Sequence, residues 1–92
     1  ETARAYLTEA FAVGDAQLAA EALGAVARAR GMTQVARVAG LSRESLYRSL
    51  GPSGNPELAT VLAVMKALGF TLAVAAAAPS EAPDDRSAVP TA

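Results

Sequence analysis

The sequence contains no cysteine and no histidine. The absence of both residue types excludes disulfide bonds, thiol catalysis, zinc fingers and the usual imidazole bases. The carboxylates at residues 9, 15, 21 and 57 are scattered, and no glycine-rich phosphate loop or metal-ligand spacing accompanies them. We therefore expect no enzyme activity, no metal and no cofactor. A cytoplasmic protein is the simplest interpretation.

Long apolar runs are also missing. The longest one, Ala73 to Ala78 with Thr71 and Leu72 before it, is far shorter than the roughly 20 residues that cross a bilayer. We expect no membrane segment and no signal peptide. Aromatic residues make up only 4% of the chain, and alanine inflates the apolar fraction of 52%. The core is therefore predicted to consist of Leu, Val and Ala on closely approaching helices.

The 92 residues fit one domain of four or five helices. We predict an all-α fold whose globular part covers residues 1 to 74. Residues 75 to 92 are rich in Ala and Pro and cannot bury enough apolar surface to fold alone, so they are interpreted as a C-terminal tail.

Residues 33 to 50 have the pattern of a helix-turn-helix. Ala36 is small where the second helix would cross the first, Gly40 can take the positive φ of a tight turn, and Ser42 is a preferred helix cap. We expect a first helix from Thr33 and a second one after Ser42. The residues expected to face inward are Val35, Ala36, Ala39, Leu41, Leu46 and Leu50.

The outward face of the second helix is predicted to be rich in groups that reach phosphates and base edges. These residues are Arg43, Glu44, Ser45, Tyr47, Arg48 and Ser49. The pattern therefore predicts an interface for double-stranded DNA.

The distribution of charge supports this prediction, although the chain as a whole carries only −1. Residues 28 to 50 contain five arginines and one glutamate, a net +4, whereas residues 1 to 27 carry −3 and residues 51 to 92 carry −2. The acidic flanks weaken nonspecific DNA affinity, so specific binding needs two copies of the unit or good base contacts.

Three further helices are predicted over residues 3 to 13, 15 to 30 and 55 to 68. Gly14 ends the first and Asp15 caps the second. Asn55 is the expected cap of the third, with Pro56 in its first turn. Gly24, inside the second, indicates a closely approaching neighbour. The predicted apolar stripes are Tyr6, Leu7, Ala10 and Phe11; Leu18, Ala22, Val26 and Ala29; and Leu58, Val61, Leu62, Met65 and Leu68.

The segment from Phe70 to Val74 alternates and is partly β-branched, which is typical of a short strand. An isolated strand has no partner in a helical chain. We therefore expect this strand to pair with its copy in a second subunit and to complete a homodimer.

The chain resembles the addiction-module antidote family, HigA-like antitoxins within the lambda-repressor-like helix-turn-helix proteins. The resemblance covers about residues 5 to 74 and rests on linked pieces: Tyr6-Leu7, Gly14-Asp15, residues 22 to 36, residues 40 to 50, Gly54-Asn55-Pro56 and Lys66-Ala67-Leu68-Gly69. It implies a five-helix domain, a small basic toxin of the RelE/ParE type as partner, and repression of the shared operon. The extension after Val74 departs from the shared pattern.

The candidate DNA contacts are Thr33, Gln34, Ser42, Arg43, Glu44, Ser45, Tyr47 and Arg48. Gln34 at the first helix start can hold a phosphate together with the positive helix terminus. Tyr47 either contacts a phosphate or packs its ring against the core. Glu44 in the first turn of its helix also has a purely structural explanation, because a negative charge there stabilises the helix through its dipole. Arg28 and Arg30 have the corresponding explanation, because positive charges are favourable near the C-terminal end of their helix.

The candidate toxin contacts are the acidic residues outside the DNA-reading unit, since a basic toxin would be attracted to them. They are Glu1, Glu9, Asp15 and Glu21. The alternatives to an antitoxin are a solitary phage-type repressor and a pure protein-interaction module that keeps the fold as a scaffold. The positive patch favours DNA binding over the scaffold.

Overall fold

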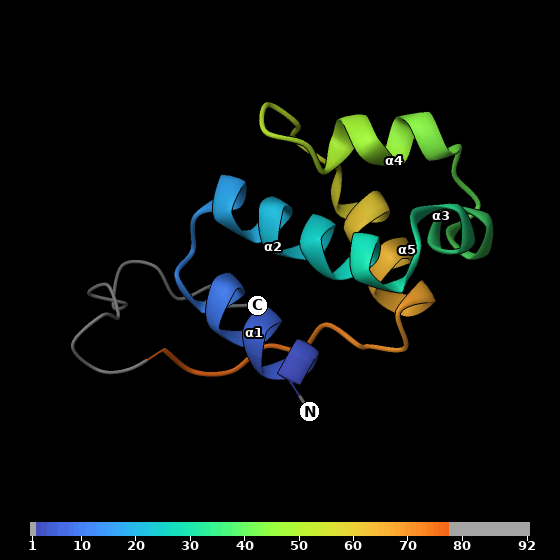
Figure 1. Cartoon of the computed structure of the whole chain (residues 1–92). Helices are drawn as coiled ribbons and strands as arrows, with labels where there is room; N and C mark the ends of the chain where they lie inside the picture. The colour runs from blue at the N-terminus through green and yellow to red at the C-terminus, as the bar shows by residue number, and fades with distance from the viewer. Residues whose placement is uncertain (1, 78–92) are drawn as a thin grey trace, which may run out of the picture.

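The computed structural model describes residues 2–77, which form five helices and no strand. They are α1 (Thr2–Ala12), α2 (Ala16–Arg30), α3 (Met32–Ala39), α4 (Arg43–Ser49) and α5 (Leu58–Ala67). Figure 1 shows α1 and α2 side by side, α4 at one edge of the molecule, and α5 behind α2 and α3. The predicted all-α, five-helix architecture is confirmed.

The core contains residues from all five helices. Each helix contributes at least one buried side chain: Leu7, Leu23, Val35, Leu46 and Val64, in the order α1 to α5. Because Leu46 in the middle of the short α4 and Leu50 directly after it are buried, that helix is attached to the core by its inner side alone. Its outer side is left to solvent.

The turn between α3 and α4 forms as the sequence predicts. Gly40 ends α3 in the left-handed region with φ 76°, where a side chain would be strained. The Leu41 N–H donates to the Ala36 carbonyl at 2.9 Å, and Leu41 packs against the core. The Ser42 hydroxyl then accepts from the Ser45 N–H at 3.0 Å and caps α4. The helix-turn-helix is therefore held by local bonds that its own residues supply.

Gly24 of α2 lies where the predicted neighbour approaches. A Cβ at this position would be 2.9 Å from the Leu50 carbonyl oxygen and 3.2 Å from the Leu50 Cβ. The contact brings the end of α4 against α2. About two turns earlier in α2, the Gln17 amide donates to the Pro52 carbonyl, so the loop after α4 is also held on α2.

The predicted starts of α1, α3 and α5 are shifted, that of α1 by one residue. α3 begins at Met32 rather than Thr33, which is within the usual uncertainty of helix ends. α5 begins at Leu58, with Glu57 as its cap and no side-chain cap bond, so the Asn55 cap is wrong. The residue before a proline favours extended backbone, which disfavours a helix at Asn55. Glu57, after the proline, is also extended, with ψ 156°, so the helix begins only at Leu58.

All three predicted apolar stripes are partly wrong. Leu58 and Leu62 of α5 are 66% and 46% exposed, while Val64, outside the predicted stripe, is fully buried. In α2, Leu18 and Ala29 are exposed and Leu23 is buried. Tyr6 is likewise half exposed on α1. Both α2 and α5 have apolar or alanine residues on several sides, so periodicity alone does not select the buried one.

The segment Phe70 to Val74 is not a strand in the described chain. Phe70 packs against the core, and its N–H donates to the Met65 carbonyl at 2.8 Å, closing the end of α5. Residues 71–77 continue as exposed, irregular chain. Most of the predicted tail, residues 78–92, lies outside the described residues. Among the helices of residues 2–77, none is long and apolar enough to cross a membrane.

Candidate nucleic-acid interface

The outer side of α4 presents an arginine and tyrosine pair. The Arg43 guanidinium lies 5.2 Å from the Tyr47 ring centroid, and its Nη2 is 3.5 Å from the Tyr47 hydroxyl. Tyr47 is 40% exposed, so its ring faces outward rather than into the core. Stacking of a guanidinium on an aromatic ring restricts its rotamers and leaves the N–H groups that do not face the Tyr47 hydroxyl free to donate.

The other candidate residues on α4 surround this pair. Glu44 and Arg48 are exposed, and Ser45 is half-buried. Ser42 uses an oxygen lone pair for the cap, which leaves its O–H available as a donor. The face therefore combines two guanidinium groups, two hydroxyl groups of Ser42 and Tyr47, and one carboxylate.

The start of α3 supplies a second part of the surface. Thr33 and Gln34 are exposed in its first turn. The cap position holds Gly31, which has no side chain to accept from the first N–H groups of the helix. Arg37 is exposed as well and lies four residues after Thr33, on the same side of the helix. It was missed as an individual candidate, although this spacing could have identified it.

Arg30 is not part of this surface. Its Nη1 donates to the Leu68 carbonyl at 3.1 Å, and its guanidinium lies 5.9 Å from the Phe70 ring centroid. These contacts join the end of α2 to the end of α5. Arg30 therefore has a structural role in joining these helix ends, in addition to the favourable position of its charge at the end of α2.

Two of the predicted toxin contacts have local partners. The Asp15 carboxylate accepts from the N–H groups of Gln17 and Leu18 at 2.8 and 3.2 Å and caps α2. Glu21 accepts from the Gln17 amide at 3.1 Å. Glu9 is exposed on α1, and Glu1 lies outside the described residues. The three described acids are all on the surface, but only Glu9 has no such bond within residues 2–77.

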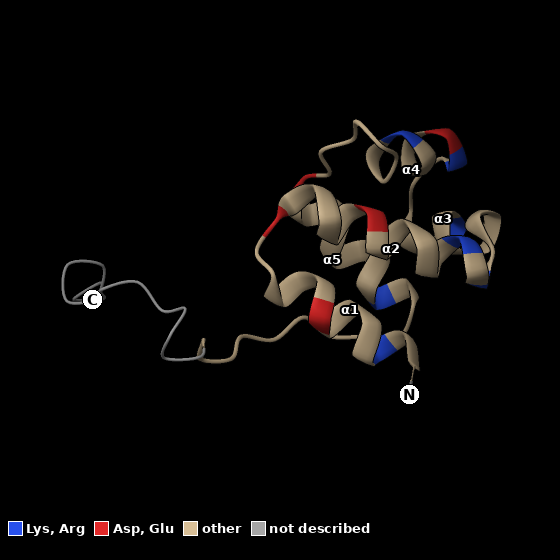
Figure 2. Ribbon diagram, turned by 60° about the vertical axis from the view of Figure 1, so that its left-hand side comes forward, with Lys and Arg blue, Asp and Glu red and all other residues tan. Residues whose placement is uncertain are grey.

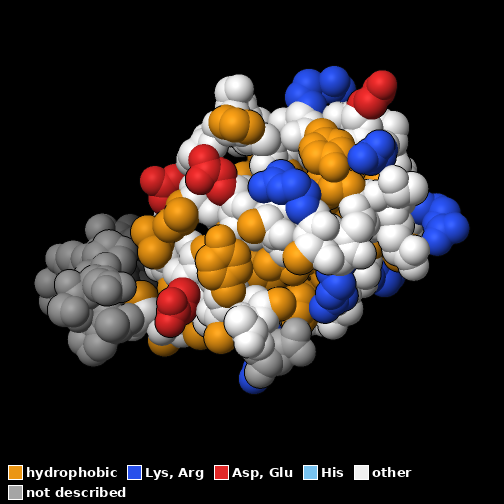
Figure 3. Space-filling view, viewed as in Figure 1, with side chains coloured by type: hydrophobic (Ala, Val, Ile, Leu, Met, Phe, Trp, Pro, Cys, Tyr) orange, Lys and Arg blue, Asp and Glu red, His pale blue; other side chains and the backbone are white. Residues whose placement is uncertain are grey.

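Basic and acidic residues are partly separated in space. Figure 2 shows blue segments on α3 and α4, with further ones on α1 and α2, and red segments on α1, on α2 and before α5, with one on α4. In Figure 3 the basic side chains likewise gather over α4 and the neighbouring edge, while most acidic ones lie toward the opposite edge. The charge separation predicted along the sequence therefore becomes a partial separation in space, with most basic residues around α3 and α4 and most acidic ones elsewhere.

The fold and this surface define an all-α domain with an exposed helix-turn-helix. A family model described as "Probable addiction module antidote protein" matches residues 1–76. An uncharacterized protein of Haemophilus influenzae is 49% identical over 74 residues, which cover 80% of this chain and 76% of the relative. No solved structure matches the chain. This chain belongs to the probable addiction module antidote family, which confirms the resemblance inferred from its sequence.

Proposed function

We propose that this chain is the antitoxin of a type II toxin-antitoxin module. It neutralises a RelE/ParE-like toxin by direct binding and represses its own operon by sequence-specific DNA binding. It works as a cytoplasmic homodimer, without catalysis and without a cofactor. Membership of the antidote family supports the antitoxin role. The exposed Arg43 and Arg48 on α4 are the observation that carries the DNA-binding role.

The DNA contacts follow from the chemistry of the two helices. α4 enters the major groove, where a guanidinium can make a bidentate contact with guanine. Tyr47 holds the Arg43 side chain outward. The uncapped start of α3 and Gln34 contact a phosphate, because first-turn N–H groups and the helix dipole favour an anion there. In a two-fold dimer the two α4 helices read half-sites about 34 Å apart.

Arg43→Ala is expected to weaken operator binding by about 1 to 3 kcal/mol, since it removes a bidentate base contact. The double variant Arg43→Ala, Arg48→Ala should lose specific binding. A gel shift with the operon's own promoter measures both effects. Arg4→Ala is the matched control: it removes the same charge from α1, away from the helix-turn-helix, and should bind like the parent chain.

A double variant that binds the promoter like the parent would remove α4 from the interface. The scaffold interpretation would be favoured by a different result, a parent chain that does not shift the promoter at all, because a pure protein-interaction module binds no DNA. The neighbouring gene distinguishes the antitoxin from a solitary repressor. A toxin-antitoxin module requires a gene for a small basic toxin beside this one.

A further inference from the structure

The last turn of α2 carries two arginines that have different neighbours. Arg28 and Arg30 are two residues apart, so their side chains leave the helix about 200° apart. Arg30 turns toward the end of α5, where it donates to the Leu68 carbonyl and lies over the Phe70 ring. Arg28 turns toward the end of α4. Both charges suit the end of α2, but the two side chains need separate explanations.

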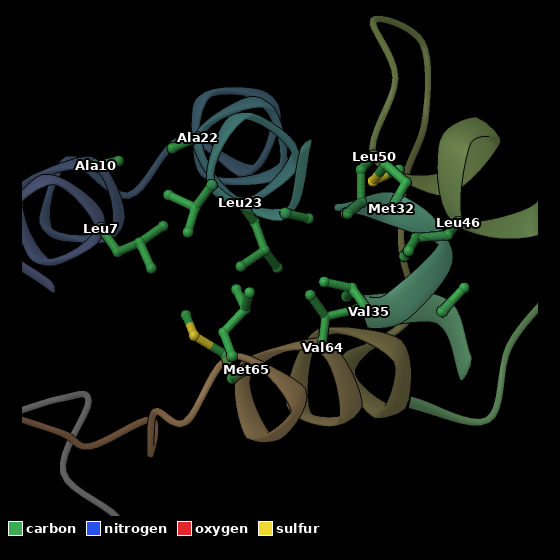
Figure 4. Close-up of a cluster of buried hydrophobic side chains, with 14 residues drawn as sticks. Leu7, Ala10, Ala22, Leu23, Met32, Val35, Leu46, Leu50, Val64 and Met65 are labelled. Atoms are coloured by element: carbon green, nitrogen blue, oxygen red, sulfur yellow. The ribbon is translucent and has the colours of Figure 1, made fainter. Parts of the chain in front are cut away.

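The Arg28 guanidinium lies where α2 and α4 meet. Gly24 is one turn before Arg28, on the same side of α2. A Cβ on Gly24 would be 3.4 Å from Arg28 Nη1 and 2.9 Å from the Leu50 carbonyl oxygen. The missing side chain thus leaves a space that the guanidinium and the backbone at the end of α4 share. Figure 4 shows the Leu50 side chain pointing into the core, which fixes this end of α4.

The Arg28 guanidinium is available to a ligand. Arg28 is exposed. Arg30 and Arg43 donate hydrogen bonds to the Leu68 carbonyl and the Tyr47 hydroxyl, whereas Arg28 makes neither a hydrogen bond nor an ion pair within residues 2–77. A guanidinium carries five N–H donors and binds anionic oxygens strongly. The junction of α2 and α4 therefore presents a positive group with its donors unused in the described chain.

We infer that Arg28 binds a phosphate of the DNA backbone when α4 enters the major groove. The inference rests on the proposed DNA-binding function and adds α2 to the DNA surface. Figure 3 shows basic side chains over α4 and over its junction with α2. The DNA surface then extends from the start of α3 and the outer side of α4 onto the last turn of α2.

The position of Arg28 selects a phosphate rather than a base. α4 has seven residues and is about 10 Å long, with Arg43 at its start and Arg28 beside its end. The major groove is about 12 Å wide, and the phosphates of the two strands border it. When α4 occupies the groove, a side chain from the helix behind it meets this border and not the base edges. Such a contact positions α4 without reading sequence.

The test compares the salt dependence of DNA binding between the full chain and Arg28→Gln. Each phosphate contact contributes about −0.9 to the slope of log K against log salt concentration. The proposed dimer has two copies of Arg28, so the variant should make the slope shallower by about 2 and weaken binding about fiftyfold at 0.1 M salt. Fluorescence anisotropy with the operon's own promoter and with a shuffled duplex measures both quantities. The loss should be equal on the two duplexes.

Two further variants separate a phosphate contact from other effects of the charge. Arg4→Gln removes the same charge from α1, away from this junction, and should keep the slope of the parent chain. Arg28→Lys should keep it as well, because an ammonium binds a phosphate as a point charge. Urea denaturation of each variant measures stability separately. A purely structural Arg28 would change the free energy of unfolding and leave the slope unchanged.

Three outcomes would overturn the inference while the parent chain still binds its promoter. They are an Arg28→Gln variant with the slope of the parent, a loss confined to the promoter duplex, and an equal loss of slope in Arg4→Gln. Each of them would remove Arg28 from the surface and leave α4 as the DNA-reading helix. A parent chain that binds neither duplex at any salt concentration would instead contradict the DNA-binding function itself, and the inference with it.

Discussion

Gly24 shows how one missing side chain sets the position of α4. Alanine is the better helix former by about 1 kcal/mol, so a Gly24→Ala change would stabilise an isolated α2. In the folded chain, however, the new Cβ would meet the Leu50 carbonyl oxygen at 2.9 Å, and that neighbour is backbone. The helix propensity of alanine therefore stabilises the variant, whereas the contact with Leu50 destabilises it.

Gly24→Ala is expected to destabilise the protein by about 1 to 3 kcal/mol, the usual cost of overpacking. Chemical denaturation of parent and variant measures the difference in free energy of unfolding. Ala25→Gly is the control at the adjacent, exposed position, and should cost only the propensity term of about 1 kcal/mol. A stabilised Gly24→Ala variant would mean that Leu50 moves away without cost.

At the scale of the element, α4 depends on one side chain for its start and on two leucines for its attachment. It is only seven residues long, too short to be stable alone. Its cap, the Ser42 hydroxyl on the Ser45 N–H, lies on the same surface as the candidate DNA contacts. Ser42 therefore contributes both to the stability of α4 and to the proposed DNA surface. Different substitutions of Ser42 can change one property without the other.

Ser42→Ala should lower the free energy of unfolding by about 1 kcal/mol, because it removes the cap. Ser42→Asp should keep the cap and the stability but weaken operator binding, since its carboxylate faces DNA phosphates. Thermal unfolding and a promoter gel shift of the same preparations measure the two effects. If Ser42→Asp bound the operator as tightly as the parent, the start of α4 would lie away from the DNA.

At the scale of the whole molecule, the separation of charges gives toxin and operator different surfaces. We therefore predict that the proposed toxin and the operator bind one antitoxin dimer together, with Glu9 the best placed of the acidic candidates, since Asp15 and Glu21 already have partners in α2. Mixing the chain, the toxin and labelled operator should give a band of lower mobility than the binary complex.

Glu9→Lys should weaken toxin binding and leave the operator band unchanged, because α1 contributes no residue to the proposed DNA surface. Release of DNA when toxin is added at low ratios would show instead that the two surfaces overlap. The charge separation would then have no role in keeping the partners apart.

The sequence by itself determined the helix-turn-helix and the family. Signals such as Gly40 and Ser42 act through bonds to residues a few positions away, so they are readable without the rest of the fold. The outward position of Arg43 follows from the same local pattern. The DNA and toxin contacts themselves are still predictions.

Only the tertiary structure decided which sides of α2 and α5 are buried. Leu62 and Val64 are both apolar, although one is exposed and the other buried. Hydrophobic periodicity cannot predict the buried side of a helix that has no polar side. The packing of Phe70 beneath Arg30, in place of a strand, likewise depends on residues 40 positions apart. Such choices are made by the neighbours that a helix meets, and the local pattern does not contain them.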